Sequence, residues 1–232
     1  MAVPTNGVLD NFNRADGSVG ANWSVAMADY PVPGILSNEL NWPQYPSMYW
    51  NPTLFNADQE SFVKCVTSIY NAKRGHLLRF TNPNSAVENG YHVLCTNGES
   101  CYASLNKIVA GDQTEIAYAN WVMDPTDVWS WVTIIGSVIK LYGSADGITW
   151  TLRTTWTDTT FSGGGYIGLW SQNNGSGPFG RMDNFGGGNV VSVTLDNCLP
   201  DADITTTGWT TTPLYSKVND ASDATVIQAT AV

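Results

Sequence analysis

The sequence predicts an all-β protein made of stacked sheets, and three observations support this fold class. Charged residues make up only 13% of the chain, and the 22 glycines and 10 tryptophans favour strands and turns over helices. Short strand-like segments recur about every ten residues between turn pairs such as Asn89-Gly90 and Asp146-Gly147. Long segments with the period of a helix are absent from the sequence. Such a series of short strands predicts a sandwich or a barrel.

Each expected strand is placed by its alternation of side chains or by the turns that bound it. In the clearest one, residues 62–70, Val63 and Cys65 point to one face while Lys64 and Val66 point to the other. The other expected strands cover residues 75–81, 91–96, 102–109, 114–120, 128–135, 138–142, 148–156 and 166–172.

The same tripeptide occurs near both ends of this series, as Asp10-Asn11-Phe12 and as Asp183-Asn184-Phe185. We expect the first and last strands to pair and to close one domain over residues 5–188. Residues 186–190, which are rich in glycine, read as a linker. Residues 189–232 then form a short C-terminal β arm or the start of a second β domain, because some forty residues cannot readily build a core of their own.

Net charge argues against two classes of partner. The chain carries a charge of −10 with a pI of about 4.3, whereas nucleic-acid binding requires a basic surface. No apolar stretch approaches the roughly 20 residues of a membrane span, so membrane insertion is not expected. Residues 1–6 contain neither a basic region nor an apolar core of a secretory signal.

Residues 10–23 resemble the opening of a concanavalin A-like lectin/glucanase (LamG-like) jelly-roll domain of the kind found in bacteriophage structural proteins. Residues 142–150 look like the hairpin of that family, and residues 165–170 with 183–185 look like its closing strands. This resemblance implies an all-β, two-sheet sandwich with a concave face. Residues 201–209 and 214–220 resemble the start of another β domain common in phage structural proteins.

By analogy with these phage proteins, an acidic, β-rich chain without a catalytic carboxylate cluster is expected to be a non-enzymatic protein of the virion surface that decorates the capsid or the tail. Its partners would be other virion proteins or copies of itself, bound through residues 191–232, together with cell-surface glycans. Because one fold serves many functions, two alternatives stay open. One is a secreted or cell-surface carbohydrate-binding module in an extracellular location, and the other is a divergent glycoside hydrolase.

Residues 41–52 hold four aromatic residues and three prolines, the composition expected of a rigid sugar-binding loop. A second loop near residue 173 supplies amides that can bind sugar hydroxyls. The candidate glycan-binding residues are Trp42, Tyr45, Tyr49, Trp50, Asn173 and Asn174. In the alternative interpretation the rings fill one end of the sandwich or form a subunit contact.

No residue is predicted to be catalytic. Glycoside hydrolysis needs two neighbouring carboxylates, and Glu115, the nearest candidate, has no partner in its strand. His76 and His92 lie among apolar neighbours and are predicted to be structural or surface histidines. Residues 144–150 come close to a sialidase-type Asp-box but are one residue short, and they are predicted to form a structural hairpin around Asp146.

No cofactor is expected, although a structural metal and a disulfide are weighed. Asp10 and Asp183 would meet where the end strands pair and could hold a calcium ion. The alternative is that each carboxylate accepts backbone hydrogen bonds in its own turn. If residues 97–99 form a three-residue loop, Cys95 and Cys101 face each other and a disulfide fits; the alternative is two reduced cysteines.

Overall fold

The structure is a computed structural model of the 232-residue chain. It divides into two compact units, Met1–Val191 and Ser192–Val232. The residues it describes are 2–27, 33–42, 47–66, 73–96, 101–172, 180–190, 215–219 and 225–229.

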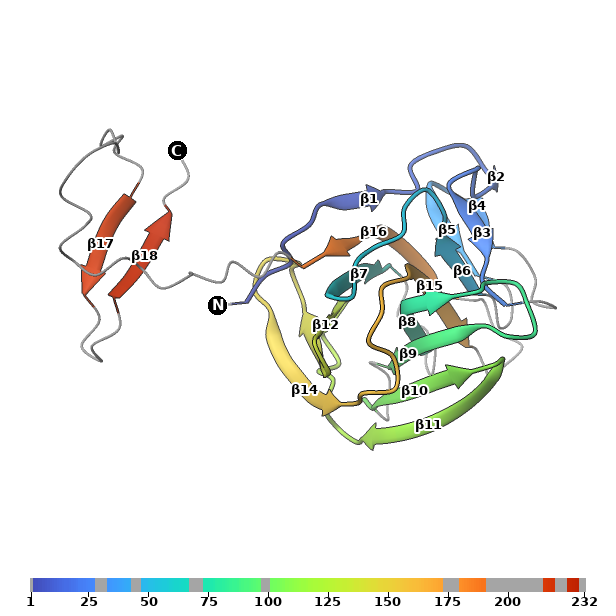
Figure 1. The fold of residues 1–232 in the computed structure, drawn as a ribbon. Coiled ribbons are helices and arrows are strands. Elements are labelled where there is room, and N and C mark those ends of the chain that lie inside the picture. Colours follow the sequence, from blue (N-terminus) through green and yellow to red (C-terminus); the bar gives the residue numbers. More distant parts are fainter. Residues whose placement is uncertain are drawn as a thin grey trace, which may run out of the picture. The chain divides into compact units, whose positions relative to one another are not determined.

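Two antiparallel sheets make up the first unit (Figure 1). In the described residues the nine-stranded sheet, here sheet A, follows the order β14 (Thr151–Thr157), β13 (Val138–Ser144), β12 (Trp129–Ile135), β7 (Gln59–Cys65), β16 (Arg181–Asn189), β5 (Glu39–Asn41), β4 (Gly34–Leu36) and β2 (Gly17–Ser18), with β1 (Val8–Asp10) paired to β16. The seven-stranded sheet, here sheet B, follows the order β11 (Asp112–Ala119), β10 (Ala103–Val109), β9 (Asn89–Cys95), β8 (Lys73–Thr81), β15 (Tyr166–Gln172), β6 (Ser47–Trp50) and β3 (Trp23–Val25).

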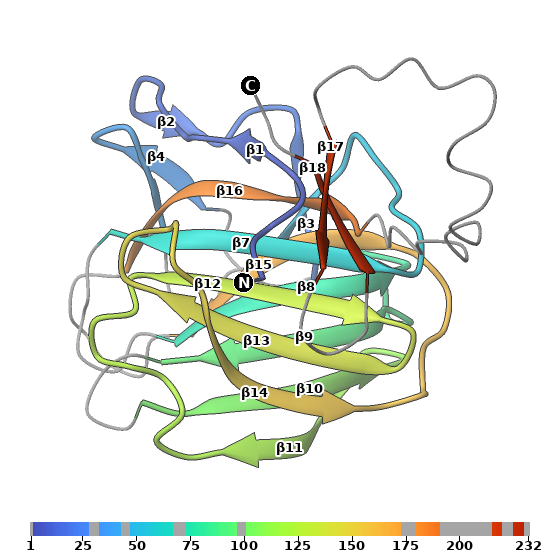
Figure 2. The ribbon, with the colours of Figure 1, turned by 90° about the vertical axis from the view of Figure 1, so that its left-hand side faces the viewer.

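The described part of the chain contains strands and turns but no helix, and none of it could cross a bilayer as a helix. Figure 2 turns sheet A toward the viewer, with sheet B behind it. The predicted all-β, two-sheet sandwich is therefore confirmed.

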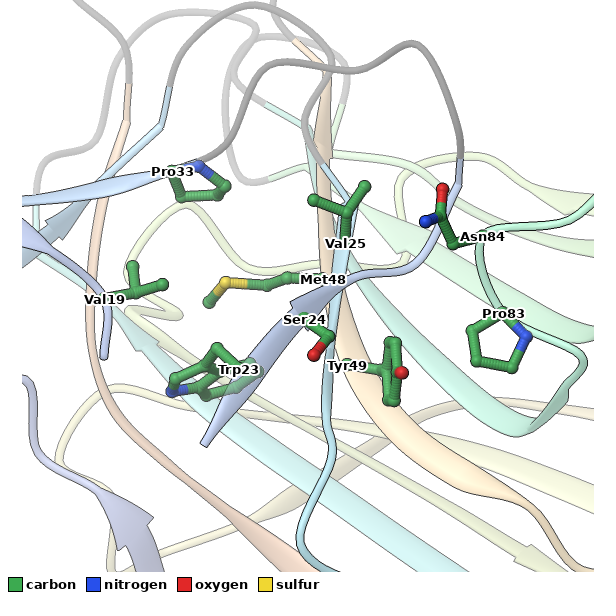
Figure 3. A pocket seen from close by; sticks show the side chains of 9 residues that line it. All are labelled: Val19, Trp23, Ser24, Val25, Pro33, Met48, Tyr49, Pro83 and Asn84. Atoms are coloured by element: carbon green, nitrogen blue, oxygen red, sulfur yellow. The ribbon is translucent and has the colours of Figure 1, made fainter. Parts of the chain in front are cut away.

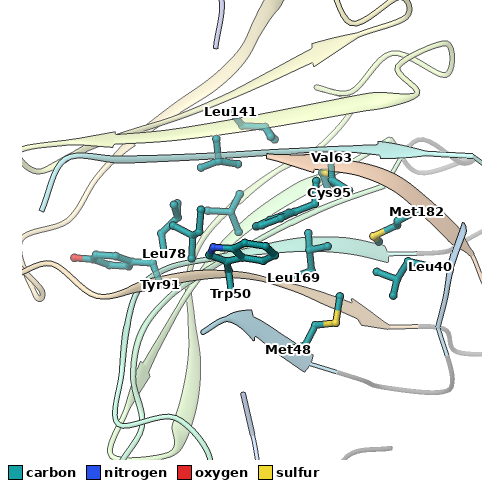
Figure 4. Packing of buried hydrophobic residues seen from close by; sticks show 14 of the residues in the cluster. Leu40, Met48, Trp50, Val63, Leu78, Tyr91, Cys95, Leu141, Leu169 and Met182 are labelled. Carbon is teal, nitrogen blue, oxygen red and sulfur yellow. The ribbon is translucent and has the colours of Figure 1, made fainter. Parts of the chain in front are cut away.

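The core lies between the two sheets because each strand alternates its side chains. On β7, Val63 belongs to the main buried cluster, whereas its neighbour Phe62 packs with Trp131 on the outer face of sheet A. Figure 4 shows Val63 and Leu141 of sheet A facing Leu169 and other apolar side chains of sheet B. This shared apolar interior supplies the main driving force for stacking the sheets.

The two copies of the Asp-Asn-Phe tripeptide close the sandwich as predicted. β1 pairs with β16 antiparallel, with Asp10 opposite Phe185. Phe12 and Phe185 are fully buried and both pack on one indole, with ring centroids 5.7 and 4.8 Å from that of Trp23. Aromatic pairs at these separations add about 1 kcal/mol each beyond their buried area.

An N-terminal strap, defined here as residues 5–7, is held across the outer face of sheet A by Glu60. The Oε1 atom of this fully buried carboxylate accepts hydrogen bonds from the backbone N–H groups of Thr5 and Asn6, both at 2.7 Å, and from their side chains at 2.9 and 2.7 Å. Its Oε2 atom accepts one from Trp131 Nε1 at 3.0 Å. Five donors thus offset the cost of burying one charge.

The predicted linker at residues 186–190 is wrong, because Gly186, Gly187 and Gly188 belong to β16 and pair with β7. Glycine is needed at these positions because neighbouring segments lie very close to the backbone of β16. A Cβ atom on Gly186 would lie 2.5 Å from the Gly7 carbonyl oxygen, and one on Gly188 would lie 2.8 Å from Asn6 Oδ1. The predicted domain boundary between residues 188 and 189 consequently falls inside a strand.

The second unit contains one described hairpin, β17 (Tyr215–Asn219) paired with β18 (Thr225–Ala229). Lys217 lies opposite Ile227 in its register. The strands predicted over residues 191–196 and 204–211 lie outside the described residues.

Candidate functional site

A pocket of about 440 Å³ lies beside β3, the edge strand of sheet B (Figure 3). Its lining residues come from the N-terminal strands, from β6 and from the turn after β8: Val19, Trp23, Ser24, Val25, Pro33, Met48, Tyr49, Pro83 and Asn84. A volume of this size lies within the range of small-molecule sites in proteins.

The floor of the pocket is apolar because β3 and β6 lend it residues that also contribute to the core. Trp23 pairs with Trp50 and Val25 with Met48 in the ladder between the two strands. Trp23 and Met48 are buried, so only a small part of each reaches the pocket. A close-packed floor of this kind fixes the shape of the cavity.

Of the two aromatic residues that line the pocket, Trp23 and Tyr49, Tyr49 is the more exposed. It follows Met48 on a strand, so it points to the opposite face, where its ring packs on Tyr166 with centroids 4.6 Å apart. Tyr49 is half-buried, so part of its ring can contact a ligand. The packing on Tyr166 holds the ring in place before any ligand arrives.

Two polar side chains accompany this ring. The Ser24 hydroxyl accepts a hydrogen bond from Asn51 Nδ2 at 2.8 Å, which leaves its own proton for a further acceptor. Asn84 is exposed, has a φ of 55°, and is held by a 2.7 Å hydrogen bond from its N–H to the Ala26 carbonyl. Pro83 precedes it and restricts the turn.

Of the predicted glycan-binding residues that the structure describes, Trp42, Tyr49 and Trp50, only Tyr49 lines this pocket. Trp42 has 0% and Trp50 8% of its surface exposed, and both belong to the main core cluster. These two rings therefore fill the sandwich, which was the alternative interpretation, and offer no face for a sugar to stack on. Tyr45, Asn173 and Asn174 lie outside the described residues.

Sequence reasoning missed Ser24, Pro83 and Asn84. Their contribution depends on strand pairings that bring residue 24 near residue 84, which no local pattern shows. The available signal was the Asn82-Pro83-Asn84 turn, since an Asn-Pro pair marks a rigid connection.

Asp10 and Asp183 match the hydrogen-bonding alternative better than the calcium site. Asp10 accepts hydrogen bonds from the Phe12 N–H at 2.8 Å and from Trp23 Nε1 at 2.7 Å, and Arg14 pairs with both of its oxygens at 3.1 and 2.6 Å. Asp183 accepts from the N–H and side chain of Asn184. Because the Arg14 guanidinium already contacts both oxygens of Asp10, the two carboxylates do not form a suitable ligand set for a calcium ion. No group of three metal-binding side chains occurs in the residues that the structure describes.

Both histidines are buried and structural. His76 lies between the hydroxyls of Ser61 and Ser130, at 2.9 and 2.8 Å from its two ring nitrogens. Burial lowers the pKa of His76 to about 3, and burial lowers the pKa of His92 to the same value. Both rings are therefore neutral at physiological pH, and neither has any exposed surface from which to act on a substrate.

Cys95 and Cys101 are not placed as expected. The ladder between β9 and β10 puts Cys95 opposite Ala103, not opposite Cys101. The Cys95 sulfur instead accepts a hydrogen bond from Nε of the buried Arg74 at 3.4 Å. The cross-strand position on which the disulfide depended is thus not formed, while loop residues 97–100 lie outside the described residues.

The turn around Asp146 has the predicted structural character. Asp146 Oδ1 accepts hydrogen bonds from the N–H groups of Ile148 and Thr149 and from the Ser144 hydroxyl, and these bonds lower its pKa to about 2. Gly147 has a φ of 76°, and a Cβ atom there would lie 2.9 Å from the Trp129 ring. Only glycine fits this turn without strain.

This chain is similar to known proteins in structure but not in sequence. No protein-family model matches the chain, and no curated protein matches its sequence. The VIP36 exoplasmic/lumenal domain in its Ca²⁺/Man2-bound form is similar, with 12% identity, coverage of 84% of this chain and 90% of that chain, and a TM-score of 0.54. The legume lectin-like domain from Entamoeba histolytica is similar at 11% identity, 76% and 97% coverage, and a TM-score of 0.52.

A carbohydrate-binding module from Bacillus subtilis, CBM66, has 16% identity, covers 75% of this chain and 96% of that chain, and has a TM-score of 0.48. The two lectin-like structures with the higher scores show that this chain has a lectin-like jelly-roll fold. The expected concanavalin A-like sandwich is therefore confirmed.

Proposed function

We propose that this protein is a non-enzymatic glycan-binding module whose ligand occupies the pocket beside β3. The observation that carries the proposal is the composition of the pocket, which combines one half-buried aromatic ring with a hydroxyl and an amide. Sugars present apolar C–H faces that pack on aromatic rings and hydroxyl groups that need hydrogen-bond partners.

In this proposal each lining group has one role. Tyr49 supports the apolar face of one sugar ring, while Ser24 and Asn84 bind hydroxyls at its rim. Pro33 and Pro83 limit the motion of the segments that carry them, which lowers the entropy lost on binding. The structurally similar VIP36 domain is in a Ca²⁺/Man2-bound form. A mannose disaccharide is therefore the first ligand to test.

The absence of catalysis is part of the same proposal. The described residues that line the pocket include no aspartate or glutamate. Enzymatic cleavage of a glycosidic bond ordinarily uses two carboxylates about 5–10 Å apart. Two of the buried carboxylates outside the pocket, Asp10 and Glu60, are occupied by protein hydrogen bonds.

Replacing Tyr49 by alanine is expected to weaken glycan binding about 30-fold, since loss of one aromatic contact costs about 2 kcal/mol. Tyr49→Phe keeps the ring and should bind nearly as well as the wild type. The measurement is a glycan array followed by calorimetric titration of the best ligand, with thermal unfolding of each variant as a check on folding. An array with no binding at millimolar glycan would rule out the proposal.

The amide of Asn84 offers a sharper test, because glycine keeps its left-handed backbone conformation. Asn84→Gly is expected to weaken binding about 5- to 10-fold through loss of its hydrogen bonds. Asn82→Gly is the matched control, since Asn82 has a φ of 51° and does not line the pocket. Equal affinities of the two variants would remove Asn84 from the site.

We further propose, from the resemblance to phage proteins, that the module works on the virion surface and that the second unit anchors it to other virion proteins or to copies of itself. A two-stranded hairpin such as β17–β18 is marginal alone and offers open edges to another strand. Deleting residues 192–232 should abolish assembly, measured by sedimentation, while residues 1–191 stay folded. Unchanged assembly would favour the alternative, an extracellular carbohydrate-binding module that acts alone.

A further inference from the structure

A second aromatic surface lies at the far edge of sheet B and plays no part in the pocket. It consists of Lys73, Tyr102, Tyr118 and Trp121, here called the Trp121 platform. Tyr118 lies on β11, the edge strand, whereas the pocket lies beside β3 at the other edge. Six strand spacings of about 4.8 Å put roughly 29 Å between the two edges along the sheet.

The rings of the platform are at least partly exposed and are arranged in order. Tyr102 and Tyr118 are stacked, with centroids 5.2 Å apart and planes at 28°. Lys73 Nζ lies 5.7 Å from the Tyr102 centroid, which buttresses that ring. Tyr118 is 50% exposed and Trp121, three residues later, is 72% exposed. Three consecutive peptide units span at most about 11 Å, so the Cα atom of Trp121 lies within that distance of the Cα atom of Tyr118.

Trp121 is held in a conformation that packing does not explain. Its φ is 56°, in the left-handed region, which is costly for a bulky residue. The turn that carries it is anchored, since the N–H groups of Val122 and Met123 both donate to the Cys101 carbonyl at 2.9 and 3.0 Å and Met123 is buried. The indole itself gains little from this strain because it faces solvent. Such strain in an exposed residue points to a role in binding.

The surroundings of the rings are polar, which favours a sugar over an apolar protein surface. The Tyr118 hydroxyl donates a hydrogen bond to Asn120 Oδ1 at 3.3 Å. Burial, and then the negative charge of Glu115, raise the pKa of Tyr102, so the Glu115 carboxylate lies near this ring. The outer residues of β11 from Asp112 to Glu115 are exposed and polar. Isolated aromatic faces among amides and charges match the alternating apolar and hydroxyl surfaces of a glycan. The net charge of −10 favours a neutral one.

We propose that the Trp121 platform is a second, open binding surface for an extended neutral polysaccharide, distinct from the pocket. This inference rests on the proposed glycan-binding function and adds that the ligand is a chain. Trp121 and the tyrosine pair contact successive sugar units, while the pocket takes a single unit or a chain end. A long polysaccharide that reaches both sites gains affinity because the second contact is intramolecular.

The test is affinity electrophoresis of the full chain in gels that contain mixed-linkage β-glucan, xylan, mannan or hydroxyethyl cellulose. Trp121→Asn removes the ring and keeps a residue that tolerates the left-handed conformation. It is expected to weaken retardation by the polysaccharide about 10-fold, whereas Trp121→Phe should stay within about threefold of the wild type. Ile148→Asn is the matched control, because Ile148 is 75% exposed on a different hairpin, and it should have no effect.

Each outcome separates this inference from the pocket. Short oligosaccharides on an array should respond to Tyr49→Ala and not to Trp121→Asn, while long polysaccharides should respond to Trp121→Asn. If the wild type is not retarded by any of the four polysaccharides, or if Trp121→Asn is retarded normally, the platform proposal is overturned, whatever the array shows for the pocket. A change in sedimentation on Trp121→Asn with unchanged retardation would identify the platform as a protein contact and would also overturn it.

Discussion

Replacing Glu60 by alanine is expected to lower the free energy of unfolding by about 4 kcal/mol or more, one of the two largest effects we predict. The substitution removes the acceptor of five donors: Trp131 Nε1, whose hydrogen bond is buried, and four groups of Thr5 and Asn6, whose hydrogen bonds are partly buried. Each buried donor left unpaired costs about 1–3 kcal/mol, although water entering the space will recover part of this. Equilibrium denaturation in urea measures the change.

A matched pair of variants separates the charge of Glu60 from the shape of its side chain. Glu60→Gln keeps the volume but replaces one acceptor by a donor, so we expect a loss of about 2–3 kcal/mol. Glu115→Gln changes an exposed carboxylate and should alter stability by less than about 0.5 kcal/mol. Hydrogen exchange at the Thr5 and Asn6 amides should rise in both Glu60 variants. Unchanged exchange there would show that the carboxylate does not hold the strap.

The second large effect is expected for Gly187→Ala in β16. A Cβ atom on Gly187 would lie 2.2 Å from the Glu60 carbonyl oxygen and 2.8 Å from the Ser61 Cα, and its φ is +141°. Because both clashes are with backbone atoms, a side-chain rotation cannot relieve them, and the strands must separate. We expect a loss of about 3 kcal/mol or more, the sum of overpacking and backbone strain.

Gly163→Ala is the control for this prediction. Gly163 lies in a loop of the same unit and lacks a left-handed φ, and a Cβ atom added to it would meet no other atom within 4 Å. Its replacement by alanine should change the midpoint of thermal unfolding by no more than a few degrees. If Gly187→Ala were equally mild, the close approach of β16 to β7 would not be a constraint on the fold.

The sequence was a good guide to the closure of the sandwich and to its turns, for local reasons. The Asp-Asn-Phe tripeptides carry their own hydrogen bonds and their own aromatic anchor, so each copy shows its role without knowledge of distant partners. The turn at Asp146 is equally self-contained, because its acceptor, donors and glycine lie within six residues.

Predictions failed where a residue's role depends on a distant segment. Gly186 to Gly188 read as a linker, since nothing local shows that the strap and β7 lie against them. Glu60 looks like an ordinary strand residue in sequence, yet its donors come from residues 5, 6 and 131. Trp42 and Trp50 looked like a sugar platform because composition cannot tell a buried indole from an exposed one.

The strap has a consequence for how the module can be joined to other proteins. Asn6 Nδ2 donates to the Asn189 carbonyl oxygen at 2.9 Å, so the polypeptide enters and leaves the sandwich at neighbouring points. A domain with adjoining ends can be inserted into a surface loop of a host protein, or permuted circularly by linking those ends and opening an exposed turn such as the one at Gly136. The sandwich is thus suited to transfer as a cassette.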